Sequence, residues 1–115
     1  MNVKKKISLL ILVHNRKKHV DNLLDYYRDL DADIFILDSS KKKTVFKAFP
    51  HVTHLFTPEK NYYNKVQEAI NNHVKTPYVV CVADDDVLLK NAIPKCIRAL
   101  EKEPKASFVQ GLYIN

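Results

Sequence analysis

Three consecutive aspartates are the residues of this sequence whose types and spacing best suit chemistry. Asp84, Asp85 and Asp86 follow directly on the apolar run Tyr78–Ala83. Unit charges about 4 Å apart repel by about 4 kcal/mol at an effective dielectric of about 20, and a divalent cation would remove that repulsion. Mg²⁺ and Mn²⁺ commonly take one or two carboxylates plus substrate phosphates as ligands. The triplet therefore predicts a metal-bridged phosphate site, and the alternative is a solvated acidic turn that caps the next helix.

Two further polar clusters each follow an apolar run. His14-Asn15-Arg16 follows the run Ile7–Val13, and Asp38-Ser39-Ser40 follows residues 33–37. In open parallel sheets, ligands bind outside the carboxyl ends of the strands. If these runs are parallel strands, the two clusters and the aspartate triplet can converge on one crevice.

Single residues in these clusters have more than one interpretation. Asp38 could accept a hydrogen bond from a ribose hydroxyl or a base N–H, or it could form an Asx turn. Arg16 and Lys65 could bind phosphates or could be solvated. His14 could stack on a base or titrate near neutral pH, or it could be an ordinary turn residue.

The glycine content and the charge restrict how an anion could be bound. Gly111 is the single glycine of the 115 residues, so neither a dinucleotide-binding glycine motif nor a phosphate-binding P-loop can be written in this sequence. Lys and Arg outnumber Asp and Glu by 19 to 13, a net charge of +6, which favours an anionic partner such as a nucleotide, nucleic acid or a membrane surface. The lysine runs 4–6 and 41–43 lack interleaved aromatic residues, which favours solvated loops over a nucleic-acid interface.

The hydrophobic pattern predicts strands that alternate with helices. Continuous apolar runs of strand length are typical of strands buried on both faces of a parallel sheet, and spacings of three and four indicate amphipathic helices. The predicted strands are 7–13, 33–37, 51–56, 78–83 and 106–114, and the predicted helices are 20–30, 61–73 and 91–102, with a helical turn within 41–49. For the helix 61–73 the expected buried stripe is Tyr62, Val66, Ala69 and Ile70.

These elements predict a single α/β domain over residues 1–115, with an open, mostly parallel, Rossmann-like sheet and helices on both faces. The two cysteines, Cys81 and Cys96, lack the spacing of a metal site and are expected to be small core residues. The basic start and the run Ile7–Val13 superficially resemble a signal peptide, but no small-residue cleavage site follows them, so a buried first strand is expected. No stretch approaches the roughly 20 apolar residues of a membrane span, so a soluble, cytoplasmic protein is expected.

The order of these motifs resembles the nucleotide-binding half of family 2 glycosyltransferases of the GT-A fold. The resemblance rests on residues 8–16 (SLLILVHNR), 36–40 (ILDSS), 76–86 (TPYVVCVADDD) and 91–111, and it covers nearly the whole chain. Residues 83–86 resemble the metal motif Ala-Asp-Asp-Asp of a bacterial subgroup. Where the family commonly has two aspartates after the second strand, this sequence has Asp38-Ser39.

The resemblance implies a site and a reaction. It implies transfer of sugar from a nucleotide sugar, often a UDP sugar, to a glycan or other acceptor, with a metal that stabilises the departing diphosphate. It implies contacts with the nucleotide base and ribose by His14, Asn15, Arg16 and Asp38. Together with Lys65, which the residues alone indicated could bind phosphate, the expected nucleotide-binding residues are Val13, His14, Asn15, Arg16, Asp38, Lys65 and Asp84. The expected ligands of Mn²⁺ or Mg²⁺ are Asp84, Asp85 and Asp86, with Asp85 as the first choice.

The family places its acceptor site and general base in a C-terminal half. We therefore expect residues 1–115 to be a nucleotide-sugar-binding domain, a fragment of a longer protein, with the general base beyond Asn115. Two other functions remain open from the sequence. One is a nucleotidyltransferase-like enzyme, against which the single glycine counts. The other is a non-catalytic α/β module that binds nucleotides, nucleic acid or a partner protein.

Overall fold

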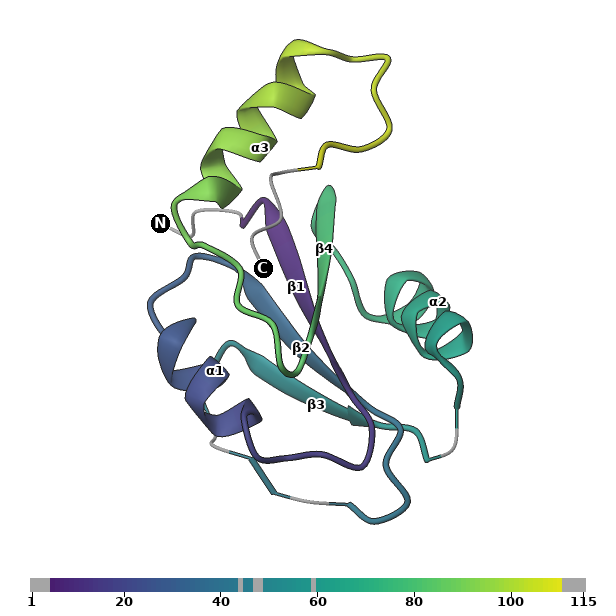
Figure 1. The fold of residues 1–115 in the computed structure, drawn as a ribbon. Helices are drawn as coiled ribbons and strands as arrows, with labels where there is room; N and C mark the ends of the chain where they lie inside the picture. The colour runs from purple at the N-terminus through teal and green to yellow at the C-terminus, as the bar shows by residue number, and fades with distance from the viewer. Residues whose placement is uncertain (1–4, 44, 47–48, 59, 111–115) are drawn as a thin grey trace.

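A computed structural model describes residues 5–43, 45–46, 49–58 and 60–110 of the chain. Strands and helices alternate along much of its length (Figure 1), because long apolar runs form buried strands and amphipathic segments form the helices that cover them. In chain order the elements are β1 (Ile7–Val13), α1 (Val20–Tyr26), β2 (Asp33–Asp38), β3 (Val52–Phe56), α2 (Tyr62–Asn72), β4 (Tyr78–Ala83) and α3 (Ala92–Lys102).

The strands form one sheet in the order β3-β2-β1-β4, and all three pairings are parallel. The central strand β1 pairs on both sides, so that Val13 lies opposite Asp38 of β2 and Leu12 lies opposite Ala83 of β4. Parallel strands place their carboxyl ends at one edge of the sheet. The order and direction confirm the predicted open parallel sheet.

Helices cover both faces of the sheet, as predicted. On one face α1 packs against alternate residues of β1 and β2, such as Leu9, Ile11 and Ile34, and α3 covers the lower-numbered end of the same face through Ile93 and Ile97. On the other face α2 packs against the residues between them, including Leu10 and Phe35 of β1 and β2. Figure 1 shows α1 and α2 on opposite sides of the sheet.

The predicted helix 20–30 is shorter in the structure, because α1 ends at Tyr26. Residues after it still follow the apolar spacing: Tyr27 is fully buried, and its hydroxyl accepts a hydrogen bond from the backbone N–H of Leu88 at 2.8 Å. The chain meanwhile leaves the helix through a turn in which Arg28 N–H donates to the Asp25 carbonyl. Burial thus continues past the helix, which is why the spacing overestimated its length.

The C-terminal strand predicted for 106–114 is wrong in its described part. Residues 106–110 are irregular and exposed, and Phe108 is 78% exposed; residues 111–114 lie outside the described residues. An apolar segment becomes a strand only where it finds a ladder of hydrogen bonds. The described residues of 41–49 likewise contain no helical turn, and residues 44, 47 and 48 of that segment are outside the description.

Strand β4 is less buried than its sequence indicates. It lies at the edge of the sheet as far as the structure describes the chain, and Val79 is 38% exposed. The two cysteines are half-buried: Cys81 of β4 packs in the cluster beneath α2, and Cys96 lies on α3. Among the helices described, none is both long and apolar enough to cross a membrane.

Candidate nucleotide-binding and metal site

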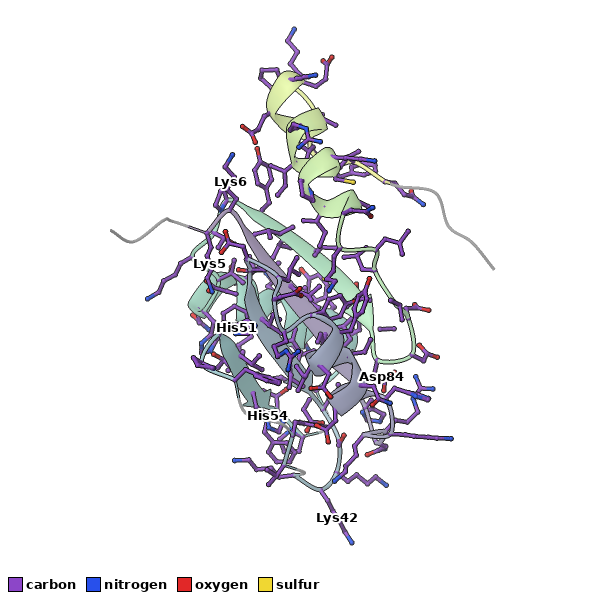
Figure 2. All side chains as sticks on the ribbon, turned by 90° about the vertical axis from the view of Figure 1, so that its left-hand side faces the viewer. Lys5, Lys6, Lys42, His51, His54 and Asp84 are labelled. Atoms are coloured by element: carbon purple, nitrogen blue, oxygen red, sulfur yellow. The ribbon has the colours of Figure 1, made fainter. Side chains whose placement is uncertain are left out.

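Three polar loops meet at the carboxyl edge of the sheet. They follow β1, β2 and β4, which are adjacent, and carry the clusters 14–16, 38–40 and 84–86. Figure 2 shows Asp84 and Lys42 toward the lower end of the sheet and Lys5 and Lys6 toward its upper end. The topology therefore brings together the three clusters that the sequence analysis expected to converge.

A cavity of about 510 Å³ lies between these loops and the start of α2. Five of the seven residues predicted to bind nucleotide line this cavity, whereas Asn15 and Asp38 do not. Its lining residues are Leu12, Val13, His14, Arg16, Ser39, Lys60, Asn61, Tyr62, Lys65, Ala83 and Asp84. The cavity has a carboxylate, several cations and an aromatic side chain within one volume, a combination suited to a polar ligand with a planar group.

The aspartates of the triplet have different environments. The side chain of Asp84 is 4% exposed, that of Asp85 is 49% exposed, and Asp86 is exposed. The Arg16 guanidinium donates to Asp84 Oδ1 at 2.6 Å, and its Nη1 lies 3.5 Å from Asp85 Oδ2. One cation thus contacts two carboxylates at the edge of the cavity.

The alternative of a helix cap does not describe these contacts. The N-cap residue of α3 is Asn91, and residues 87–90 separate it from the triplet. Asp84 is instead held at the end of β4 and paired with the loop after β1. The triplet does form a turn, in which Asp86 N–H donates to the Ala83 carbonyl at 3.2 Å, and Asp85 and Asp86 are exposed. Asp84 differs from them because it is buried, lines the cavity and pairs with the exposed guanidinium of Arg16.

The carboxylates at this edge fit a metal ion that takes part of its coordination from a bound phosphate ligand. No group of three His, Cys, Asp or Glu side chains within the described residues is arranged to hold a metal ion alone. Asp84 and Asp85, however, both reach the same guanidinium, so their oxygens are within reach of one shared cation. Mg²⁺ and Mn²⁺ sites that use one or two carboxylates take the remaining oxygens from phosphates and water. Asp86 is outside this pair, since it makes neither contact with Arg16.

Lys65 is buried beneath the cavity, where its ammonium group joins two strands. Its Nζ donates to the Val13 carbonyl at 3.0 Å, the Leu37 carbonyl at 3.2 Å and Ser39 Oγ at 3.0 Å. Burial lowers the pKa of Lys65, although the nearby carboxylates of Asp38 and Asp84 act to raise it. Three donors meet three acceptors, which is how a buried ammonium group avoids the cost of desolvation.

The buried stripe predicted for α2 was confirmed for Ala69, which is buried, and for Val66, which packs against the same cluster, but it was wrong for Tyr62 and Ile70. The buried residues of the helix are Lys65 and Ala69, whereas Tyr62 and Ile70 are 59% and 43% exposed. Lys65 takes a buried position because the strand ends beneath it present carbonyl oxygens that need a donor. A pattern based on apolar side chains excludes such a lysine.

Asn15 and His14 tie the loop after β1 to the loop after β2. Asn15 has a φ of 56°, a left-handed conformation that asparagine adopts more readily than most residues. Its N–H donates to Ser40 Oγ at 2.7 Å, and its Oδ1 accepts from the N–H of Lys41 at 3.0 Å. His14 Nδ1 lies 2.8 Å from Ser39 Oγ. Asn15 therefore positions the two loops and lies outside the cavity lining.

Asp38 is fully buried, and both its carboxylate oxygens have partners in the protein. Oδ1 accepts from the N–H of Ser40 at 3.0 Å, the Asx turn that the sequence left open, and Oδ2 lies 2.9 Å from His54 Nε2. Burial acts to raise the pKa of Asp38, but the hydrogen bonds from Ser40 and His54 outweigh it and hold the pKa below its usual value. In this arrangement Asp38 shapes the loop, and a contact with ribose stays a prediction.

The lowered pKa of Asp38 predicts acid-sensitive stability. A carboxylate whose pKa is lower in the folded state stabilises the protein fully above its unfolded pKa of about 3.9, and this contribution is lost as the pH falls through the folded pKa. Asp38→Asn is therefore expected to lower the free energy of unfolding by about 1–3 kcal/mol at pH 7, and by progressively less below about pH 4. Urea unfolding at several pH values measures this difference. With Asp31→Asn, an exposed control, little change is expected at any pH; a pH-independent loss in Asp38→Asn would contradict the assignment.

Six residues that line the cavity were not among the predicted binding residues: Leu12, Ser39, Lys60, Asn61, Tyr62 and Ala83. Asn61 is the N-cap residue of α2, and its side chain accepts from the N–H of Asn64 at 2.8 Å. An asparagine directly before the first apolar residue of the helical spacing is a recognisable N-cap signal, and it agrees with the start predicted for this helix.

Residues 8–115 match the family model described as Glycosyl transferase family 2. The match includes the loops after β1, β2 and β4 and the start of α2. No curated protein shows a significant match to the chain.

Proposed function

Since this chain belongs to glycosyl transferase family 2, we propose that its cavity binds a nucleotide sugar, most simply a UDP sugar, for transfer to a glycan or other acceptor. The observation that carries the proposal is the contact of Arg16 with both Asp84 and Asp85 at the edge of the cavity. This contact brings two carboxylates and a guanidinium together. A metal ion needs the negative charge of the carboxylates, and a diphosphate needs the positive charge of the guanidinium.

The residues of the site have separate roles in this proposal. Mn²⁺ or Mg²⁺, when bound, supplies positive charge that stabilises the departing diphosphate. Asp84 and Asp85 would hold the metal, with Asp86 as a further candidate, and Arg16 would contact phosphate oxygens. Lys65 keeps the ends of β1 and β2 together and adds positive potential below the cavity. His14 and the backbone of Val13 border the space for the nucleoside.

The rival functions have weaker support in the described contacts. Lys5 and Lys6 lie near Asp33 and Glu101, at 3.5 and 3.2 Å, so part of the basic charge is neutralised within the protein. A basic cavity of about 370 Å³, lined by residues 15–17 and 40–42, lies next to the proposed site and would suit an anionic group. Binding of nucleic acid is therefore included in the test of function. We also propose a cytoplasmic location, in which any contact with a membrane surface is peripheral.

Calorimetry with UDP, with and without Mn²⁺, tests the function. UDP binding is expected to require Mn²⁺, and Asp85→Ala is expected to weaken it at least about tenfold because a metal ligand is lost. Glu103→Ala, an exposed carboxylate just after α3, is the matched control and should bind as the unaltered protein does. Salt-sensitive binding of oligonucleotides together with no binding of UDP would overturn the proposal.

A further inference from the structure

Tyr62 is an exposed aromatic residue that lines the proposed donor cavity. It is the first residue of α2, directly after the N-cap residue Asn61, and it is 59% exposed. The hydrogen bond from Asn64 N–H to Asn61 Oδ1 fixes the start of the helix. The backbone that carries the Tyr62 ring is therefore ordered by a cap.

The Tyr62 side chain also lies close to β4. The thiol of Cys81 on β4 acts to raise the pKa of the Tyr62 hydroxyl, so the two side chains are neighbours. Cys81 belongs to the core cluster between the sheet and α2, and burial raises the pKa of its thiol, which keeps it neutral. A ring that is carried by a capped helix start and lies next to the sheet loses little freedom when a ligand covers it.

The neighbouring Tyr63 provides a contrast within the same helix. It is 67% exposed, which is similar to Tyr62, but it is not among the residues that line the cavity. Consecutive residues of a helix point in different directions, since each turn contains 3.6 residues. Of these two exposed tyrosines, Tyr62 is therefore the one whose position on the helix places it in the cavity lining.

The polar and aromatic groups are distributed unequally in the cavity. Arg16 and Asp84 come from the loops after β1 and β4, whereas Lys60, Asn61 and Tyr62 come from the start of α2. Lys60 forms an ion pair with Glu68, which compensates its charge. A nucleoside diphosphate has a matching division, with charged phosphates at one end and a planar base at the other.

We propose that Tyr62 stacks on the nucleobase of the donor bound in this cavity, an inference that rests on the proposed function. Base–aromatic stacking contributes about 1–3 kcal/mol per base, equivalent to roughly 5- to 150-fold in affinity. The ring contacts the base and leaves the diphosphate to the charged residues. Tyr62 thus determines affinity for the nucleoside part of the donor.

The test compares UDP with inorganic pyrophosphate, each in the presence of Mn²⁺. Tyr62→Leu keeps an apolar side chain but removes the aromatic face, and it is expected to weaken UDP binding by about tenfold. Its affinity for pyrophosphate should stay within about twofold of the unaltered protein. Tyr62→Phe keeps the ring and should retain most of the UDP affinity, and Tyr63→Leu is the control for a tyrosine outside the cavity.

The outcomes separate this inference from the proposed function. UDP binding that is unchanged in Tyr62→Leu overturns the stacking role while the donor site stands. An equal loss of UDP and pyrophosphate binding also overturns it, because the substitution would then act through the phosphate end. If the unaltered protein does not bind UDP with Mn²⁺, the proposed function itself fails, and the inference fails with it.

Discussion

Lys65→Met is expected to lower the free energy of unfolding by about 3 kcal/mol, the largest loss of stability among the substitutions considered. The methionine fills the space of the lysine stem but leaves the carbonyls of Val13 and Leu37 and the hydroxyl of Ser39 without this donor. A buried polar group without its partner costs about 1–3 kcal/mol. The carboxylates of Asp38 and Asp84 also lose a nearby positive charge.

Urea unfolding and thermal melting measure this loss, which corresponds to a fall of roughly 10 °C in Tm for a domain of this size. Lys75→Met is the matched control, because Lys75 is exposed just after the same helix. A surface substitution of this kind changes stability by less than about 0.5 kcal/mol. If Lys65→Met fell within that limit, the three hydrogen bonds would not be stabilising the strand ends.

Asp84→Asn is expected to weaken Mn²⁺-dependent UDP binding by at least about 100-fold, the largest functional effect. Even an outer partner of a metal ligand is worth about 10–100-fold in affinity, and Asp84 is itself a proposed ligand. The asparagine has nearly the same shape, so the fold should persist, but the cavity loses its buried charge and Arg16 loses its contact at 2.6 Å.

The triplet gives this prediction internal comparisons. Asp84 lines the 510 Å³ cavity, Asp85 is the second carboxylate that contacts Arg16, and Asp86 makes no contact with Arg16. The losses are therefore expected to decrease from Asp84→Asn to Asp85→Asn to Asp86→Asn when UDP is titrated in Mn²⁺ by calorimetry. Asp31→Asn, an exposed aspartate before β2, should leave binding unchanged. Equal losses at all three positions would indicate a general effect of charge and would contradict the assigned geometry.

The sequence predicted the sheet well because its strands are long apolar runs. β1 and β4 have the predicted bounds, and β2 and β3 differ from the predicted segments by one residue at one end. β1 and β2 are buried along nearly their whole length, so burial dominates local preferences there, whereas the fifth predicted strand, 106–114, was wrong in its described part. The convergence of the loops after β1, β2 and β4 followed from parallel strands alone.

The sequence predicted the details of the site less well, because those details depend on contacts between distant residues. On α2, Lys65 is buried and Tyr62 is exposed, which is the reverse of what an amphipathic helix predicts for a lysine and a tyrosine. Lysine is buried because two strands supply acceptors 28 and 52 residues away in the chain, and tyrosine is exposed because the cavity opens beside the helix start. Hydrophobic spacing along the helix predicts neither the acceptors on the distant strands nor the cavity beside the helix start. Asp38 is a similar case, since its partner His54 comes from the neighbouring strand.

The hydrogen bonds that join Asn15 to Ser40 and Lys41 have a consequence for the kinetics of recognition. Two loops that border the cavity are linked to each other before any ligand arrives, by bonds of 2.7 and 3.0 Å. In the proposed function, a nucleotide would therefore enter between loops that are already joined, and its association need not wait for them to order. Differences in affinity among nucleotides should then arise mainly from how fast each one leaves.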